Sequence, residues 1–200
     1  RRSGTTERLD GLSLPMPGMH NVQNAIAAIV VARQLGVPDA VIQRGLAEFK
    51  GVGRRFTKVG AFNGAAIIDD YAHNPFKIAA AVKAARQAYA GPVVAVVQPH
   101  RYTRLRDTFE QFATCLNDAD VAVIAPVYAA GEQPIAGISR DTYAEALRAH
   151  GHRNVITIEG EADLAAAVAP YMQPGAVVVG TGAGSITHWM AKLEQKLGAL

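Results

Sequence analysis

Up to residue 50, apolar residues recur three and four positions apart, which is the spacing of amphipathic helices. Asn21 can cap a first helix that Gly36 ends, and Pro38 with Asp39 suits the first turn of a second helix. We therefore predict an all-helical segment over residues 1–50. Its two apolar stripes comprise Ile26, Ile29, Val30 and Leu35, and then Val41, Ile42, Leu46 and Phe49.

The helical spacing stops at Gly51-Val52-Gly53, where two glycines around one valine make a flexible joint. We place a domain boundary here. The hinge is expected over residues 51–54, and a second domain is expected over residues 55–200.

A β-hairpin is expected at the start of the second domain. Residues 56–59 are typical of a short strand, Asn63-Gly64 of a tight turn, and residues 65–69 of the returning strand. Short apolar runs then alternate with helical stretches, which indicates a mostly parallel sheet buried on both faces. The sequence thus predicts an α/β fold with six strands sandwiched by helices. The runs cover residues 93–97, 121–125, 155–158 and 176–179, and the helical stretches lie near 76–89, 105–117, 140–149, 161–170 and 185–197.

The composition fits a globular protein, because half of the residues are apolar and 18% are charged. Basic residues number 20 and acidic residues 17, and the basic residues are spread along the chain, which argues against a nucleic-acid partner. No apolar run approaches the roughly 18 residues of a membrane helix, and the polar start has no signal-peptide core. We expect a cytoplasmic protein without membrane contact. The chain begins without Met or an element start, so we also expect it to be part of a longer protein.

One cysteine, Cys115, cannot form an internal disulfide. It lies in the apolar stretch 112–116, which is typical of a helix face. We expect a buried structural thiol rather than a nucleophile. No group of cysteines and histidines has the spacing of a structural metal site, and the chain contains no Walker A sequence.

Ligands of parallel α/β sheets bind beyond the carboxyl ends of the strands, which here are the loops 69–75, 98–104, 126–138 and 180–185. The first loop gathers two carboxylates, a phenol, an imidazole and an amide. If the strand continues, Asp69 and Asp70 point to opposite sides, so one of them faces the cleft. A turn that leads into a helix is the alternative, but the position of the loop and its density of polar groups favour a functional role.

The second loop carries His100, Arg101 and Arg104. At the start of a helix, the two arginines would share a face and could clamp a carboxylate or phosphate. The alternative is a solvated helix start with surface arginines. In the third loop, Glu132 could bind an amine or a metal, and a plain surface loop is an equal alternative.

Two further motifs are less specific. The glycine-rich loop 180–186 superficially resembles a dinucleotide fingerprint, but the acidic residue that should follow it is missing because the chain ends. A backbone nest or close helix–strand packing explains it better. In the first segment, His20 and Asn24 lie four residues apart on one helix face, and the pattern alone slightly favours a helix cap beside a polar surface over a functional role.

Taken in order, these motifs resemble those of the Mur ligases from about Leu14 to the chain end. The most specific is Gln-Pro-His-Arg-Tyr-Thr-Arg at 98–104, which resembles the members that add L-alanine rather than glutamate, diaminopimelate or lysine. The other motifs are Gly-Met-His-Asn-Val-Gln-Asn-Ala at 18–25, Gly-Val-Gly-Arg-Arg-Phe at 51–56, Asp-Asp-Tyr-Ala-His-Asn-Pro at 69–75, and Ala-Gly-Glu with Pro-Ile-x-Gly at 127–137.

The resemblance implies the tail of a central ATPase domain at residues 1–50 and a Rossmann-like C-terminal domain at residues 55–200. The UDP-sugar domain and the P-loop would lie outside the chain. ATP would activate the carboxylate of UDP-N-acetylmuramate as an acyl phosphate, which the L-alanine amine attacks. Mg²⁺ would be held mostly by the missing domains, and hinge closure would exclude water.

The family's site residues carry over by position. His20, Asn21 and Asn24 resemble contacts to the ATP adenosine, and Arg55 resembles a hinge arginine near the nucleotide. Asp70 resembles the carboxylate that holds the ribose, with His73 and Asn74 beside it. Tyr71, His100, Arg101 and Arg104 resemble the lining of the amino-acid site, where the last three would orient the reactants and stabilise charge.

The chain departs from the family at two loops. Asn74 stands where the family usually has a second histidine, and Ser185 stands where it usually has aspartate, so Ser185 is given no role. Two other functions remain open: a stand-alone module that binds nucleotide or amino acid without catalysis, and the related ligase that recycles a ready-made tripeptide. The loop 98–104 argues against the tripeptide ligase.

Overall fold

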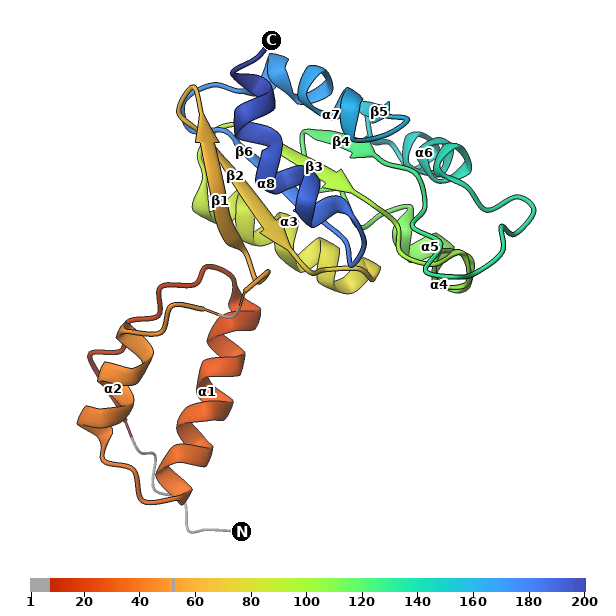
Figure 1. Ribbon diagram of the computed structural model, residues 1–200. Coiled ribbons are helices and arrows are strands. Elements are labelled where there is room, and N and C mark those ends of the chain that lie inside the picture. The colour runs from red at the N-terminus through yellow and green to blue at the C-terminus, as the bar shows by residue number, and fades with distance from the viewer. Residues whose placement is uncertain (1–7, 52) are drawn as a thin grey trace. The chain divides into compact units, whose positions relative to one another are not determined.

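The structure is a computed structural model that describes residues 8–51 and 53–200 (Figure 1). The chain divides into two compact units, with the boundary between Gly51 and Val52. Unit 1 is residues 1–51 and unit 2 is residues 52–200. No helix of the described residues is long and apolar enough to cross a membrane.

Unit 1 is a pair of helices, α1 (Met19–Gln34) and α2 (Asp39–Ala47). The predicted cap at Asn21 is wrong, because α1 begins at Met19 with Gly18 as its N-cap residue. Asn21 instead lies in the first turn, where its side-chain amide donates to the carbonyl of Pro17 at 2.7 Å. As predicted, Gly36 terminates α1: the helix ends at Gln34, and Gly36 follows the C-cap residue Leu35 with a φ of 77°, which suits a residue without Cβ.

Unit 2 contains one six-stranded sheet in the order β1-β2-β6-β3-β4-β5. The β1–β2 pair is an antiparallel hairpin, and every other pairing is parallel. The hairpin turn is at Asn63 and Gly64, as predicted, and both have positive φ. The predicted fold is therefore confirmed. The strands are β1 (Thr57–Phe62), β2 (Ala65–Asp70), β3 (Val93–Val97), β4 (Val121–Ile124), β5 (Val155–Thr157) and β6 (Val177–Thr181).

Most helices match their predicted ranges within a few residues, but the predicted helix 105–117 is wrong. The chain there forms α4 (Tyr102–Asp107) and a single turn, α5 (Phe109–Phe112), with a break at Thr108, whose hydroxyl donates to the carbonyl of Arg104. The remaining elements are α3 (Pro75–Ala88), α6 (Arg140–Ala149), α7 (Glu161–Val168), a 3₁₀ turn at Ala169–Tyr171 and α8 (Ile186–Leu197).

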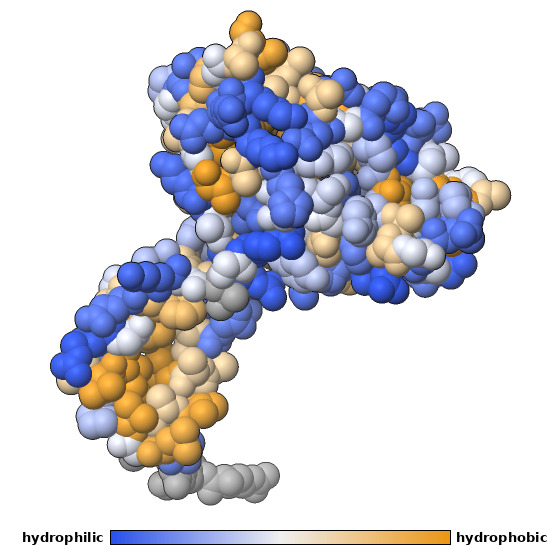
Figure 2. All heavy atoms as spheres, viewed as in Figure 1, coloured by the Kyte–Doolittle hydropathy of each residue, from blue (hydrophilic) through white to orange (hydrophobic). Residues whose placement is uncertain are grey.

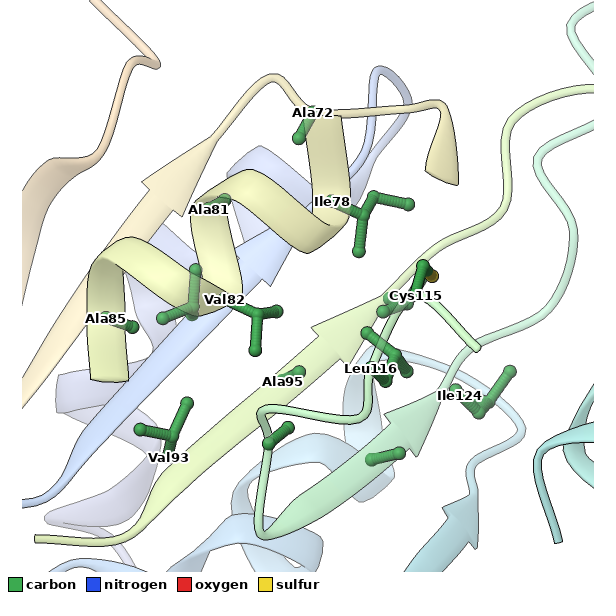
Figure 3. Close-up of a cluster of buried hydrophobic side chains, with 14 of the residues drawn as sticks. Ala72, Ile78, Ala81, Val82, Ala85, Val93, Ala95, Cys115, Leu116 and Ile124 are labelled. Carbon is green, nitrogen blue, oxygen red and sulfur yellow. The ribbon is translucent and has the colours of Figure 1, made fainter. Parts of the chain in front are cut away.

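Alternation along the strands gives the sheet two apolar faces. Val93, Ala95 and Val97 belong to one core with α3, α5 and α6, whereas Val94 and Val96 belong to another with α7 and α8. Figure 3 shows part of the first core, between α3, β3 and β4. A strand buried on both faces must be apolar at every position, which is why the sequence shows continuous runs.

Cys115 is buried in the first core, as predicted, but it lies in a turn rather than in a helix. Its thiol is 3.6 Å from the hydroxyl of Tyr143. Burial raises the pKa of the thiol to about 12, so it stays protonated at neutral pH and is a poor nucleophile.

Candidate ligand site at the carboxyl edge of the sheet

The carboxyl ends of β2, β6, β3 and β4 lie side by side, because these strands are parallel neighbours. Asp69 pairs with Gly180, Asp70 with Thr181, and Val97 with both Thr181 and Ile124. The loops that leave this edge therefore converge. They are the loops that contain the residues predicted for ligand binding.

Both carboxylates at the end of β2 are buried. Oδ2 of Asp69 accepts from the Thr187 hydroxyl at 2.6 Å and from Nε of Arg54 at 3.2 Å. The carboxylate of Asp70 accepts from the amides of Phe56 and Ala72, at 2.8 and 2.7 Å. Asp70 thus fixes the loop that follows β2, and Asp69 ties β2 to α8.

The loop after β2 presents two rings and ends in a helix cap. The side chain of Asn74 accepts from the Lys77 amide at 3.0 Å and caps α3. His73 donates from Nδ1 to the carbonyl of Tyr71 at 2.8 Å, so the neutral ring keeps its Nε2 lone pair as an acceptor. Burial is the main reason that the pKa of His73 lies below its usual value, helped by nearby cations.

The loop after β3 turns sharply at Arg101, which has a φ of 73° and precedes α4 rather than lying in it. Arg104 points back from α4 and donates to the carbonyl of His100 at 2.8 Å and to its Nδ1 at 3.0 Å. Because a guanidinium only donates, the His100 ring carries its proton on Nε2. Burial and then Arg104 lower the pKa of His100, so this ring is neutral at neutral pH.

A row of aromatic rings joins the loops after β2, β3 and β4. The ring centroids of Tyr71 and His73 are 5.0 Å apart, and those of His73 and His100 are 6.0 Å apart. His100 stacks on Tyr128 at 5.6 Å with an angle of 12° between the rings. Residues far apart in the sequence therefore form one continuous surface, with Arg101 on the same loop as His100 and Arg104 in α4.

Glu132 holds the start of α4. Its carboxylate accepts from the backbone amide of Thr103 at 3.0 Å and from the Thr103 hydroxyl at 2.6 Å, and it lies 3.8 Å from Nη1 of Arg101. The Thr103 hydrogen bonds are the main reason that the pKa of Glu132 lies below its usual value. The carboxylate is thus engaged by the protein, which favours a supporting role over the predicted amine or metal ligand.

The glycine-rich loop after β6 is packed tightly against the neighbouring loops. A Cβ added to Gly184 would lie 2.4 Å from Tyr128 Cγ and 2.6 Å from Gln98 Oε1. Gln98 also donates to the Ser185 hydroxyl at 2.9 Å and accepts from the Ile186 amide at 3.1 Å. A Cβ added to Gly180 in β6 would lie 2.3 Å from Cγ of Met190 in α8, so close helix–strand packing, one of the predicted alternatives, explains this glycine.

Arg54 belongs to the site but is absent from the sequence-based prediction. Its guanidinium donates to Asp69 and, from Nη2, to the carbonyl of Gly182 at 2.8 Å, and its Cζ lies 4.7 Å from the Tyr71 ring centroid. Arg55, which the prediction chose instead, is exposed, and its amide donates to the Thr57 hydroxyl. The side chains of these two adjacent arginines point in different directions, which a sequence pattern does not reveal.

The predicted nucleotide contacts His20, Asn21 and Asn24 belong to unit 1, whereas these loops belong to unit 2. Asn24 is exposed on α1, and the side chain of His20 lies outside the described atoms. Among the described residues, no three histidine, cysteine, aspartate or glutamate side chains are grouped to hold a metal ion.

A polar, cationic and aromatic surface at the strand ends of a parallel sheet defines an α/β ligand-binding domain. Residues 54–184 match the glutamate ligase domain of the Mur ligases, and the chain belongs to this family. It is 56% identical over all 200 residues to a UDP-N-acetylmuramate–L-alanine ligase of Nitrobacter hamburgensis. The chain spans 43% of the length of that relative.

Solved structures show the same fold. The UDP-N-acetylmuramate–alanine ligase of Thermotoga maritima superposes with a TM-score of 0.78 at 28% identity, over 94% of this chain and 40% of that one. A MurF ligase of Thermotoga maritima, solved in complex with ADP, has a TM-score of 0.64 at 20% identity, over 91% of this chain and 39% of that one.

Proposed function

We propose that the chain is the C-terminal part of an ATP-dependent ligase that joins L-alanine to UDP-N-acetylmuramate for peptidoglycan precursor synthesis in the cytoplasm. The observation that carries this proposal is the 56% identity to such a ligase along the whole chain. The ring and arginine surface supports it, because it offers an amino acid both a cationic and an apolar contact.

The amino-acid end of the site is formed by Tyr71, His100, Arg101 and Arg104. The arginines attract the carboxylate of L-alanine, and planar guanidinium groups suit a carboxylate in two-pronged fashion. His100 is neutral and donates from Nε2, so it adds a hydrogen bond without competing charge. These groups would orient the amine and stabilise the charge that develops when the acyl phosphate is attacked.

We place the nucleotide end of unit 2 at Arg55, Asp70, His73 and Asn74. For unit 1, His20, Asn21 and Asn24 stay predicted contacts to the ATP adenosine, by resemblance to the family. The resemblance to the family assigns the ribose to Asp70, a carboxylate that also accepts from the amides of Phe56 and Ala72. Asn74 already caps α3, so its contribution would be to fix the loop. The ADP complex of a MurF ligase with this fold supports a nucleotide substrate.

The described residues do not fit a Mg²⁺ site of their own, since they contain no suitable acidic cluster. We therefore place the Mg²⁺ ligands in parts of the protein beyond this chain and derive no step through the metal here. We assign residues 1–50 to the tail of a central ATPase domain, residues 51–54 to a hinge and residues 55–200 to the C-terminal domain.

The surface of unit 1 supports this assignment. Figure 2 shows hydrophobic side chains gathered over its two helices. Contiguous exposed apolar side chains mark a surface that another protein part covers, and relatives that extend well beyond this chain contain such parts. The exposed apolar residues include Met19, Val22, Ile26, Val30, Val31, Leu35, Val41 and Phe49.

The direct test compares the 200-residue chain with the longest protein that its reading frame encodes. We expect the longer protein to release phosphate from ATP only when both UDP-N-acetylmuramate and L-alanine are present, and the 200-residue chain to form no product. Product formation by the 200-residue chain would overturn the proposal that this chain requires the rest of the protein for catalysis. Product with a tripeptide but not with L-alanine would identify the recycling ligase instead.

A single substitution tests where the amino acid binds. Arg104→Met in the longer protein should raise the KM for L-alanine by about tenfold or more and change the KM for ATP little, because it removes one charged contact. Lys83→Met is the matched control, since Lys83 is an exposed cation of the same domain, in α3. Equal effects of Arg104→Met on both KM values would mean that the amino acid binds elsewhere.

A further inference from the structure

Arg54 lies at the start of unit 2, three residues after Gly51, in a strained backbone. Its φ is 60°, and that of Phe56 is 51°, so two non-glycine residues within three positions adopt the left-handed region. Such conformations cost free energy and persist only where surrounding contacts impose them. The contacts that impose them are the amide of Phe56 on Asp70 and the guanidinium of Arg54 on Asp69.

Arg54 also contacts Tyr71 twice. The backbone carbonyl of Arg54 accepts from the Tyr71 amide at 2.8 Å, and the guanidinium lies over the Tyr71 ring at 4.7 Å. Nη2 donates to the carbonyl of Gly182, in the loop after β6, which fixes the direction of the guanidinium plane. The ring of Tyr71 is partly exposed, and the guanidinium of Arg54 is a specific contact that holds it in place.

We propose that Arg54 is a positioning residue that sets the orientation of Tyr71 and thereby the amino-acid end of the site. From Tyr71 the ring row continues through His73 and His100 to Tyr128. A change in the backbone at Arg54 is thus transmitted to the loops after β2, β3 and β4. The inference rests on the proposed function, because it assumes that Tyr71 lines the amino-acid site.

The geometry gives this role to Arg54 rather than to Arg55. Arg55 is exposed, and its described hydrogen bond is through the backbone amide to Thr57. Arg54, in contrast, has its side chain 29% exposed and contacts β2, the loop after β2 and the loop after β6. One arginine of the pair is therefore directed into the unit, and its neighbour is left for solvent or ligand.

The kinetic test uses Arg54→Met and Arg54→Lys in the longest protein that the reading frame encodes. Arg54→Met should raise the KM for L-alanine by about three- to tenfold, with a smaller change in the KM for ATP. Arg54→Lys should recover part of the loss, because an ammonium restores charge over the ring but not the planar contacts to Asp69 and Gly182.

Thr187→Val is the matched control, because it removes a hydrogen bond to Asp69 without touching Tyr71. If Thr187→Val raises the KM for L-alanine as much as Arg54→Met does, the effect passes through Asp69 and the proposal is overturned. Equal changes in the KM values for L-alanine and ATP in Arg54→Lys would overturn it as well.

A spectroscopic test on the 200-residue chain separates this inference from the proposed function. The Tyr71 ring resonances, assigned by comparison with Tyr71→Phe, should shift in Arg54→Met and move partly back in Arg54→Lys, and stay in place in Thr187→Val. Shifted resonances without any ligase activity of the longer protein would leave the positioning role intact and reject the proposed function. Unshifted Tyr71 resonances in a folded Arg54→Met chain would overturn the positioning role itself.

Discussion

The two units of the chain bury their apolar residues to different extents. In unit 2, both faces of the sheet are covered, and side chains such as Tyr143 and Leu147 are fully inaccessible. Among the described residues of unit 1, only Ile42 is buried, and Leu35 is 77% exposed. A pair of short helices has too little interior to bury its stripes, whereas a sheet covered on both faces buries whole strands. Unit 2 therefore carries its own stability, and unit 1 requires a partner surface.

The largest expected effect compares one core residue from each unit. Leu147→Ala should lower the free energy of unfolding of unit 2 by about 2–5 kcal/mol, because it leaves a cavity in a closed core. Ile42→Ala should change the unfolding of unit 2 little, because Ile42 belongs to unit 1. The single tryptophan, Trp189 in α8, reports unit 2 by fluorescence during urea unfolding.

The comparison fails if Ile42→Ala shifts the Trp189 transition as far as Leu147→Ala does. Such a result would mean that the two units unfold as one cooperative body and that the helices of unit 1 contribute directly to the stability of the sheet domain.

Acid should weaken unit 2 through His152. This ring is buried, its two nitrogens have no hydrogen-bond partner among the described atoms, and burial lowers its pKa below the usual 6.5. The unfolded chain therefore binds the proton more readily. The stability contribution of neutral His152 is present above about pH 6.5 and is lost as the pH falls below it.

The variant His152→Leu isolates this effect. It should reduce the dependence of the Trp189 transition on pH between 7 and 5 and raise the stability at neutral pH by up to about 1 kcal/mol, because it removes unpartnered buried polar atoms. The exposed neighbour His150 provides the matched control His150→Gln. If the Trp189 transition of His152→Leu depends on pH as strongly as that of the unchanged chain, other groups cause the acid sensitivity.

The smallest effect on stability, and the most informative for unit 1, comes from its exposed apolar surface. Val31→Lys combined with Leu35→Lys should change the unfolding free energy by less than about 0.5 kcal/mol, because both side chains are exposed. The double variant should nevertheless lower self-association of the 200-residue chain in sedimentation velocity. Phe76→Lys, which changes an exposed residue of unit 2, is the control. If Phe76→Lys lowers self-association as much as the double variant does, the exposed apolar residues of unit 1 have no special role in it.

Much of the fold could be predicted because continuous apolar runs have few structural solutions. The run 93–97 became β3 without change, and Asn63-Gly64 placed the hairpin turn. The errors have local causes. Asn21 suits a cap, but Gly18, three residues earlier, is the N-cap residue of α1. The helix that was expected over 105–117 breaks at Thr108, whose hydroxyl donates to the backbone carbonyl of Arg104.

The candidate site was only partly predictable. Loop composition at strand ends pointed to Tyr71, His73, His100, Arg101 and Arg104, because the carboxyl ends of parallel strands meet at one edge. Whether these residues bind the ligands assigned to them stays a prediction. The sequence did not reveal Arg54, whose contacts come from residues 15 and 128 positions away in the chain.

The sequence by itself determined the strands, the hairpin, the loops that gather at one edge and the family, because these depend on local spacing and short motifs. Only the packed structure shows which polar groups already form hydrogen bonds or ring contacts within the protein. Asn74 caps a helix, Glu132 holds Thr103, and Arg54 rather than Arg55 turns inward to Tyr71. The physical reason is that a hydrogen bond or a ring contact depends on distance and direction between residues remote in sequence, and only the packed sheet sets these.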